Sequence, residues 1–546
     1  MSRLLDTRGR WVALAALALA CGCGGSSPAT TPPVSGTITP NTSGWWRDKV
    51  FYEVFVRSFA DSDGDGIGDL NGLTAHLDYL NDGDPATTTD LGVDALWLMP
   101  IFKSPSDHGY DVTDYRSINP QYGTLADFDA LIAAAHHRGI RVVLDMVLNH
   151  SSSQHPWFQA SKQGASNEKR DWYVWRSDNP GWTQPWGGSQ QVWYSLGGSY
   201  YYAVFWSQMP DLNLANPAVE AELVATMKYW LARGVDGFRL DAVRYYLESA
   251  DGGQADQPAT HAFLRRIRLA LQTDYPGALL VAEAWSSAQS QASYYGRGDE
   301  VQLAFSFEQA DAILSSIRAG ASAGLESSLS VSGSVFADRG YEAPFLSNHD
   351  QIRVQRALGG DSAAAHLAAA TLMALPGTPF LYYGEELGMQ GGAGSADQQK
   401  RTPFNWTPAK GHGFTTAAQS WFPGYDEVQG QDVESERADS TSLWSTYRKL
   451  ISLRHAQPAL LGGEVTLPAI DGCGAGCLAL LRSAAGKRIL FIANFSTAPS
   501  GPFAVDVTGI ASTLLAEGLS GLPVTTAGKL AVPGLAARSY AFFALN

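Results

Sequence analysis

Gly237-Phe-Arg-Leu-Asp-Ala-Val243 is the fourth of eight similar stretches of sequence that together decide the fold. It is short and largely apolar, as expected of a strand that is covered on both faces. Arg239 and Asp241 stand two residues apart, so their side chains point to the same side of such a strand. An arginine and a carboxylate in this arrangement indicate either a buried ion pair or part of a reactive site.

The other seven stretches are also rich in Val, Leu, Ile or aromatic residues and lack clean alternation. They cover residues 50–59, 95–101, 141–149, 278–285, 303–308, 343–350 and 379–387. Helical patterns lie between them, for example at 125–137, 217–233 and 363–374. Eight parallel strands joined by crossover helices predict an α/β fold of the (β/α)8 TIM-barrel type. The active site of such a barrel lies at the carboxyl ends of its strands.

Two regions of the chain fall outside the barrel pattern. A chain of 546 residues is too long for a single core. Residues 151–216, after the third strand, form a long insertion with many Trp and Tyr, which predicts a small inserted domain. The barrel is therefore expected over residues 45–150 and 217–458. Short strand-like runs in residues 459–546 predict a C-terminal antiparallel β-sandwich.

The N-terminus carries export signals. Three arginines precede an apolar run that is too short to span a bilayer, which predicts a signal peptide over residues 1–20. Ala18-Leu-Ala-Cys21 resembles a lipobox, so a lipidated Cys21 would tether the exported protein to the cell envelope. A plain secretory signal is the alternative. Residues 21–44, rich in Ser, Thr, Pro and Gly, are expected to form a disordered linker.

The composition restricts the partners of the protein. A formal net charge of −15 argues against nucleic acid, whose phosphates require clustered Lys and Arg. An acidic surface suits a secreted protein that acts on a neutral substrate, and it also suits a hard cation. We expect a monomer. Cys473 and Cys477 are close enough in sequence to form a local disulfide in an exported protein.

Three carboxylates, Asp241, Glu283 and Asp350, stand at the ends of predicted strands. A retaining glycosidase needs an ionised carboxylate as nucleophile and a protonated one as acid, about 5–5.5 Å apart. We expect Arg239 to lower the pKa of Asp241 and keep it ionised. The apolar neighbours of Glu283 are expected to keep that residue protonated. His150, also at a strand end, is placed to hydrogen-bond sugar hydroxyls, and the same holds for His349.

Residues 46–546 resemble the α-amylase family of glycoside hydrolases, known as family 13. The resemblance is carried by Asp145-Met-Val-Leu-Asn-His150, Gly237-Phe-Arg-Leu-Asp-Ala-Val243, Glu283-Ala-Trp285 and Phe345-Leu-Ser-Asn-His-Asp350. It implies that Asp241 is the nucleophile, Glu283 the acid/base and Asp350 the transition-state stabiliser. It further implies that the substrate is bound by Arg239, His150 and His349. His108-Gly-Tyr-Asp-Val-Thr-Asp114 resembles the family segment whose tyrosine stacks on the sugar, here Tyr110, and Asp107 is a candidate for the same subsite.

Two further segments narrow the subgroup. Gln208-Met-Pro-Asp-Leu-Asn213 resembles the form intermediate between oligo-1,6-glucosidases and neopullulanases, a group that includes lipoprotein α-amylases. Arg401-Thr-Pro-Phe-Asn-Trp406 resembles a segment of the same broad subgroup. The resemblance implies endo-acting hydrolysis of α-1,4 bonds in starch and maltooligosaccharides. The alternatives are a neopullulanase-type enzyme, an α-glucosidase or a transglycosylating enzyme, and, more remotely, a catalytically dead carbohydrate-binding accessory protein.

The segment Asp61-Ser-Asp-Gly-Asp-Gly-Ile-Gly-Asp69 suits a Ca²⁺ ion, because hard oxygen ligands alternate with glycines on a loop that can curl. It lacks the glutamate at position 12 of an EF-hand, where Gly72 stands. A solvated acidic turn is the alternative. The family resemblance implies five ligands, namely Asp61, Asp63, Asp65, the Ile67 carbonyl and Asp69. Asn149 is a candidate ligand of a second calcium between the barrel and the insertion.

Overall fold

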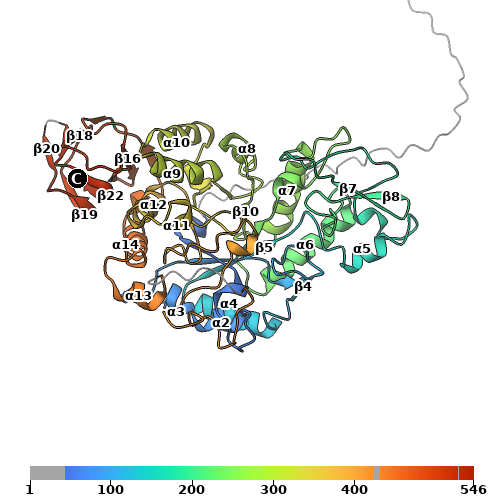
Figure 1. Ribbon diagram of the computed structural model, residues 1–546. Coiled ribbons are helices and arrows are strands. Elements are labelled where there is room, and N and C mark those ends of the chain that lie inside the picture. The colour runs from blue at the N-terminus through green and yellow to red at the C-terminus, as the bar shows by residue number, and fades with distance from the viewer. Residues whose placement is uncertain (1–43, 423–430, 527) are drawn as a thin grey trace, which may run out of the picture. The chain divides into compact units, whose positions relative to one another are not determined.

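The computed structural model describes residues 44–422, 431–526 and 528–546. Eight parallel strands form one sheet whose neighbours follow chain order. Helices lie around this sheet in Figure 1. The strands are β1 (Phe51–Val54), β2 (Ala95–Leu98), β5 (Arg141–Met146), β9 (Gly237–Leu240), β10 (Leu279–Ala282), β11 (Leu303–Phe305), β12 (Glu342–Ala343) and β13 (Phe380–Tyr382). The amides of Thr378 and Phe380 donate to the carbonyls of Glu342 and Pro344, each at 2.9 Å, and thereby close the barrel. The predicted (β/α)8 fold is confirmed.

The predicted strands are longer than the observed ones at their carboxyl ends. Residues 50–59 contain β1, but the chain then turns into the short helix α1 (Val56–Phe59). Residues 343–350 contain only the last residue of β12, and residues 346–350 lie beyond the sheet. The apolar residues continue because the chain stays buried at the barrel rim, where strand pairing has already ended. Burial pattern alone therefore cannot mark the end of a strand.

Helices surround the barrel, and the predicted helix 125–137 coincides with α4. A capping box between Thr124 and Asp127 begins this helix. The helices are α1, α2 (Leu70–Ala75), α3 (Leu77–Leu80), α4 (Leu125–His137), α5 (Pro156–Ser161), α6 (Pro217–Ala232), α7 (Pro258–Gln272), α8 (Ala288–Ser293), α9 (Phe307–Ala319), α10 (Ala323–Val335), α11 (Val354–Ala357), α12 (Ser362–Ala374), α13 (Val433–Ala438), α14 (Leu443–Ala456) and α15 (Pro458–Leu461). The described residues contain no helix that is both long and apolar enough to cross a membrane.

The side chains inside the barrel form an apolar layer and, above it, a charged layer. Phe51, Trp97, Val143 and Phe380 belong to one buried cluster inside the barrel. Gly237 permits close packing there, since an added Cβ would lie 2.4 Å from the Leu279 carbonyl oxygen. The next inward positions towards the carboxyl ends of β5 and β9 hold Asp145 and Arg239, which are paired in register. Apolar layers therefore lie beneath a charged layer at the strand ends.

The insertion after β5 builds a small sheet of its own. Its three antiparallel strands run in the order β6 (Trp175–Arg176), β8 (Ser199–Tyr202) and β7 (Trp193–Leu196). Val192, Trp193, Tyr202 and Val204 form a separate buried cluster beside it. An antiparallel bridge between His150 and Asp211 brings the end of the insertion back to the barrel. A hairpin of β3 (Phe102–Lys103) and β4 (Asp114–Ile118) follows the second barrel strand.

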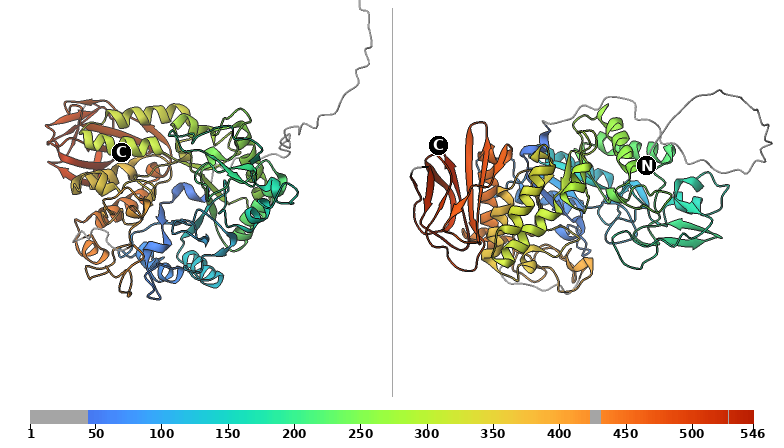
Figure 2. Two further views of the ribbon diagram at one scale, coloured as in Figure 1. Left: turned by 45° about the vertical axis from the view of Figure 1, so that its right-hand side comes forward. Right: turned by 90° about the horizontal axis from the view of Figure 1, so that it is seen from above.

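The C-terminal region consists of two antiparallel sheets that form two layers (Figure 2). One sheet has the order β14 (Glu464–Thr466), β16 (Cys477–Ala484), β17 (Lys487–Asn494), β22 (Leu535–Leu545) and β19 (Ala511–Leu519). The other has the order β15 (Ile470–Asp471), β18 (Phe503–Val505), β21 (Lys529–Val532) and β20 (Val524–Thr526). Leu490 and Phe543 of the first sheet share a core with Val505 and Leu530 of the second. The predicted sandwich is confirmed.

A disulfide and a buried arginine stabilise the start of the C-terminal region. Cys473 and Cys477 are joined by a disulfide. The Arg482 guanidinium, fully buried, donates to the Ala374 carbonyl at 2.9 Å, so the sandwich is tied to the last turn of α12. The predicted signal peptide, the lipidation of Cys21 and nearly all of the predicted linker lie outside the described residues.

Candidate active site

One arginine organises the carboxylates at the carboxyl end of the barrel. Nη1 of Arg239 lies 2.7 Å from Asp241 Oδ1 and 2.8 Å from Asp145 Oδ1, and Nη2 lies 2.9 Å from Glu283 Oε2. Arg239 is 1% exposed. Sharing one planar guanidinium holds Asp241 and Glu283 close together. Arg239 contacts carboxylates on several sides, and it does not line the cleft described below.

Glu283 follows β10 and receives a backbone hydrogen bond from the chain just beyond the end of β9. The Ala242 amide donates to Glu283 Oε2 at 2.8 Å, and Ala242 adopts a left-handed conformation with φ of 53°. This conformation is costly for alanine and aims the amide at the carboxyl group. Burial raises the pKa of Glu283 to about 7, with Asp241 and Asp350 adding to the rise and Arg239 opposing it. A carboxyl group with this pKa is about half protonated at pH 7, whereas an ordinary glutamate is almost fully ionised there.

Asp241 follows β9 and faces the same space as Glu283. Burial raises its pKa above the ordinary value, Arg239 acts in the opposite direction, and Asp145 adds to the rise. The sequence-based expectation of a lowered pKa was therefore wrong in its net direction. That expectation took account of the charge of Arg239 but not of the burial of Asp241, which outweighs the charge.

Asp350 is held by two cations. Arg401 Nη2 lies 2.8 Å from Asp350 Oδ1, and His349 Nε2 lies 3.2 Å from Oδ2. Although burial acts to raise it, these two residues hold the pKa of Asp350 well below its usual range. Asp350 and Glu283 therefore differ in protonation at neutral pH, because one carboxyl group has two cationic partners and the other is mainly desolvated.

The predicted substrate-binding residues divide into two groups. Tyr110 and His150 line the cleft. Burial lowers the pKa of His150 to about 4, so its ring is neutral, and its buried Nε2 has no hydrogen-bond partner among the described residues. His349 is fully buried behind Tyr110, with Nδ1 2.6 Å from Glu53 Oε1 and Nε2 2.7 Å from the Tyr110 hydroxyl. The expectation that His349 contacts sugar hydroxyls therefore does not fit this arrangement.

Asp107 lies away from these residues. Its Oδ2 accepts a hydrogen bond of 3.0 Å from Gln398 Nε2, and it is absent from the described walls of the cleft. It meets the segment that carries Asp397 and Arg401, both of which line the cleft. Its position is consistent with support of that wall.

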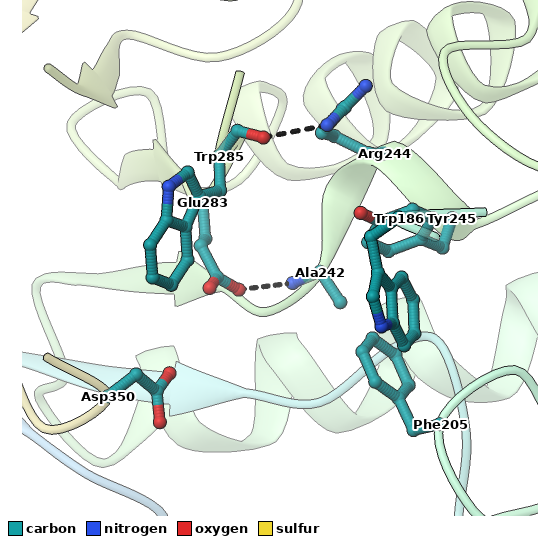
Figure 3. Close-up of a pocket in the computed structure, with 8 residues that line it drawn as sticks. All are labelled: Trp186, Phe205, Ala242, Arg244, Tyr245, Glu283, Trp285 and Asp350. Atoms are coloured by element: carbon teal, nitrogen blue, oxygen red, sulfur yellow. Dashed lines mark hydrogen bonds between the residues drawn. The ribbon is translucent and has the colours of Figure 1, made fainter. Parts of the chain in front are cut away.

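The cleft has two chambers that share Phe205, Ala242, Glu283 and Asp350. The inner chamber, of about 240 Å³, is lined by His108, Tyr110, His150, Phe205, Met209, Asp241, Ala242, Glu283, Asp350, Asp397 and Arg401. The outer chamber, of about 440 Å³, is lined by Trp186, Phe205, Ala242, Arg244, Tyr245, Glu283, Trp285 and Asp350 (Figure 3). Glu283 and Asp350 thus lie where the two chambers meet, whereas Asp241 lines the inner chamber but not the outer one.

Several residues of the site were not predicted from the sequence. Asp145 and Arg401 belong to quoted segments but were given no role. Glu53 and Trp97 were also missed. Glu53 contacts His349, and Trp97 Nε1 donates to Asp145 Oδ2 at 3.3 Å. Their inward positions on β1, β2 and β5 could have identified Glu53, Trp97 and Asp145, because all three fall near strand ends. No spacing rule would have found Arg401 or Trp186.

The acidic loop brings three of its five predicted ligands together. One oxygen from each of Asp61, Asp63 and Asp65 lies within 4.8 Å of the others. The oxygens around a Ca²⁺ ion at 2.3–2.6 Å are at most about 5 Å apart, so this set fits the ion. The Asp65 amide acts to lower the pKa of Asp63, but slight burial and the neighbouring carboxylates raise it overall, a repulsion that a cation would relieve.

The other two predicted ligands of the loop differ from this group. Both oxygens of Asp69 accept hydrogen bonds, at 2.7 Å from the Ser62 amide and at 2.8 Å from Gly72, where Asp69 caps α2. Asp69 thus caps α2 and lies outside the group of three, although both oxygens of Asp61 likewise accept hydrogen bonds, from the Gly64 and Gly66 amides at 2.8 Å. The Ile67 amide donates to Asp65 Oδ1 at 2.7 Å, which closes the loop.

The candidate second calcium site contains one unsatisfied oxygen. Asn149 Nδ2 donates to Asp211 Oδ2 at 3.0 Å, and both residues are buried. Asn149 Oδ1 has no hydrogen-bond partner among the described residues. Burial raises the pKa of Asp211 well above its ordinary value, although the Val204 amide and Asn149 both donate hydrogen bonds to this carboxyl group. An oxygen ligand and a buried carboxyl group suit a hard cation.

Comparisons with known proteins agree with this geometry. Residues 53–463 match the family described as the catalytic domain of α-amylase. α-Amylase 3 of Dictyoglomus thermophilum is 39% identical over 426 residues, which cover 77% of this chain and 80% of the relative. A trehalose synthase/amylase of Mycobacterium tuberculosis is 34% identical over 530 residues, covering 87% and 85%. The crystal structure of α-amylase from H. orenii aligns with a TM-score of 0.80 at 38% identity, covering 91% of this chain and 99% of that chain. Together with the barrel and its carboxylates, these matches show that the chain belongs to the α-amylase family of glycoside hydrolases.

Proposed function

We propose that the protein hydrolyses internal α-1,4-glucosidic bonds of starch and maltooligosaccharides with retention of configuration. The observation that carries this proposal is the sharing of the Arg239 guanidinium by Asp241 and Glu283, two carboxyl groups that both face the inner chamber. Retaining glycosidases use a closely spaced pair of this kind. The two chambers on either side of Glu283 suit a substrate that continues beyond the bond to be cleaved.

In the proposed reaction, the Asp241 carboxylate attacks the anomeric carbon while Glu283 protonates the departing glycosidic oxygen. The sugar is then bonded to Asp241, and Glu283 is left as the conjugate base. Glu283 next removes a proton from water, the hydroxyl attacks the anomeric carbon, and Asp241 leaves. The Asp350 carboxylate, kept ionised by His349 and Arg401, stabilises the positive charge that develops on the sugar ring.

His150 and Tyr110 contribute binding in this scheme. The neutral His150 ring faces the inner chamber with a free Nε2, which fits a sugar hydroxyl as partner. The Tyr110 hydroxyl is hydrogen-bonded to Asp145 Oδ2 at 3.0 Å, which fixes the ring so that its face can stack on a pyranose. Arg239 and His349 act one step away, through the carboxylates and the tyrosine that they hold.

A second candidate is transfer of the glucosyl unit to a sugar acceptor instead of water. The relative of M. tuberculosis is named for both activities, as a trehalose synthase/amylase. The covalent intermediate can react with either acceptor, because the same carboxylates serve both reactions. The shape and residues of the outer chamber decide which acceptor is held against Glu283.

The early products from starch, maltoheptaose, pullulan and cyclodextrin distinguish these activities by chromatography. We expect a spread of maltooligosaccharides to appear before glucose, because chain on both sides of the scissile bond can be bound. Glucose as the sole early product would contradict the endo mode. A new disaccharide, or chains longer than the substrate, would instead favour transfer.

We also propose that Asp61, Asp63 and Asp65 bind Ca²⁺ and stiffen the barrel rim. The loop contacts a segment that is distant in sequence, since the Trp421 amide donates to the Gly66 carbonyl at 2.7 Å. An exported enzyme that is tethered through Cys21 or secreted would find this ion outside the cell.

Chelation should lower the melting temperature. Binding of calcium to the folded form alone adds about 2.7 kcal/mol when the ion is at a hundred times its Kd. The measurement is differential scanning calorimetry with EDTA and with excess calcium. The double variant Asp63→Asn/Asp65→Asn should have the melting temperature of the chelated wild type, and added calcium should not raise it. The control Asp84→Asn, in another loop, should respond to chelator and calcium as the wild type does. Equal melting temperatures with and without chelator, together with no bound metal, would remove the proposal.

A further inference from the structure

The outer chamber has an aromatic wall that the catalytic steps do not use. Trp186 stacks on Phe205 with ring centroids 5.3 Å apart and an interplanar angle of 25°. Tyr245 meets both rings edge-on, at 5.2 Å from Trp186 and 5.7 Å from Phe205. Figure 3 shows these three side chains gathered on one side of the chamber. Trp186 is 46% exposed, so much of its indole is free to meet a ligand.

Hydrogen bonds fix the loop that carries Trp186. Gln184 Nε2 donates to the carbonyls of Val204 and Phe205 at 3.2 and 3.1 Å, and Gln190 Nε2 donates to Phe205 at 3.3 Å. The backbone amide of Gln184 also donates to the backbone carbonyl of Gln190 at 3.0 Å, which closes the loop. The tryptophan is therefore held in place before any ligand binds, and 46% of its surface is left uncovered by the described residues.

The facing wall is fixed as well. Trp285 is 45% exposed and stacks on Phe307 at 4.7 Å and 11°. Its carbonyl accepts a hydrogen bond of 2.7 Å from Arg244 Nη1, and Arg244 Nη2 lies 2.5 Å from Asp256 Oδ2. The chamber thus presents an aromatic face on either side, and the carboxyl groups of Glu283 and Asp350 also border it.

Such a chamber suits a pyranose ring. Aromatic faces match the apolar C–H faces of a sugar, whereas the hydroxyls at the ring edge require polar partners such as Arg244 and the carboxylates. A ring in the outer chamber would present its bridging oxygen to Glu283, which borders both chambers. The aromatic wall comes from the insertion after β5, which carries Trp186 and Phe205, and from the chain after β9, which carries Tyr245.

We propose that the outer chamber binds the saccharide on the leaving-group side of the scissile bond, and that Trp186 is the residue that selects for it. This inference rests on the proposed glucosidic cleavage and names its substrate class, a glucan that fills both chambers. The same wall would hold a sugar acceptor in the reverse direction of the first step.

The test compares Trp186→Ala with the control Trp206→Ala on two substrates. Trp206 is similarly exposed, at 48%, but does not line either chamber. Maltotetraose fills both chambers, whereas the leaving group of α-glucosyl fluoride is a single atom and leaves the outer chamber empty. We expect Trp186→Ala to lower kcat/KM on maltotetraose about tenfold and on the fluoride by less than about twofold. Trp206→Ala should change neither.

Binding provides a second readout that does not depend on turnover. In the Asp241→Asn background, Trp186→Ala should weaken the Kd for maltotetraose about tenfold in titration calorimetry, and Trp206→Ala should not. Equal losses on both substrates, or unchanged maltotetraose kinetics and affinity, would overturn the role of Trp186. A wild-type protein that cleaves neither substrate would remove the proposed function, and the affinity comparison would still decide the binding role of the chamber.

Discussion

Asp241→Asn is expected to lower kcat/KM on maltoheptaose by about four orders of magnitude, the scale of losing a nucleophile from a preorganised site. The amide has the shape of the carboxylate and can still accept the hydrogen bond from Arg239, which is 2.7 Å in the wild type. It cannot form a stable ester-like bond with the anomeric carbon. The change therefore removes the covalent route and leaves the surrounding contacts in place.

Steady-state rates and melting curves of the purified variants provide the measurement. Asp129→Asn is the matched control, because Asp129 pairs with Arg233 on the outside of the barrel and is half exposed. We expect the control to keep its activity and both variants to stay folded. An Asp241→Asn protein that retains activity within about tenfold of the wild type would refute the assignment of the nucleophile.

Glu283→Gln should give the second large effect, and its size should depend on the leaving group. Loss of a general acid costs about 10²- to 10⁴-fold when the leaving oxygen needs a proton, as in maltoheptaose. Fluoride leaves without this help, so the variant should release a rapid burst of fluoride from α-glucosyl fluoride. Turnover should then be slow, because water lacks its base. A variant without a burst, or with equal losses on both substrates, would contradict the acid/base role.

The same residue sets the expected pH profile. Burial raises the pKa of Glu283 to about 7, and the acid form is the active one in the first step. Wild-type kcat/KM on maltoheptaose should therefore fall as the pH rises through about 7. The burst rate of Glu283→Gln on the fluoride should lack this alkaline limb. An identical limb in the variant would assign it to another group.

The fold could be predicted because each barrel strand is buried on both faces and shows this in its apolar run. The exact ends could not be predicted in this way, since residues 55–59 remain buried after β1 has turned into a helix. The sandwich was predicted from runs such as residues 488–494, which fall within β17. Its order of strands depends on pairings far apart in sequence, and local pattern carries no information about them.

The candidate site could likewise be predicted only in part. Asp241, Glu283 and Asp350 could be placed together because each follows a barrel strand. One of the two cationic partners of Asp350 could not be predicted, since Arg401 comes from a segment 51 residues further along the chain. The pKa of Asp241 was misjudged because the sequence shows a neighbouring charge but not the depth of burial.

Tertiary contacts also decide the roles of His349 and Trp186. Both ring nitrogens of His349 have protein partners, Glu53 on one side and Tyr110 with Asp350 on the other. Trp186 gains its position from amide contacts across the insertion. Residue type predicted a sugar contact for His349, but only the tertiary contacts show that both of its ring nitrogens have protein partners and that the Trp186 indole is exposed.

The central claim is that a glucosyl unit becomes bonded to Asp241, and trapping that intermediate tests it most directly. The Glu283→Gln protein would be mixed with α-glucosyl fluoride, quenched in acid during the slow phase, digested and analysed by mass spectrometry. The account predicts one added glucosyl residue on the peptide that contains Gly237 to Val243, located at Asp241. An unmodified Asp241 after a full fluoride burst, or the sugar on another residue, would contradict it.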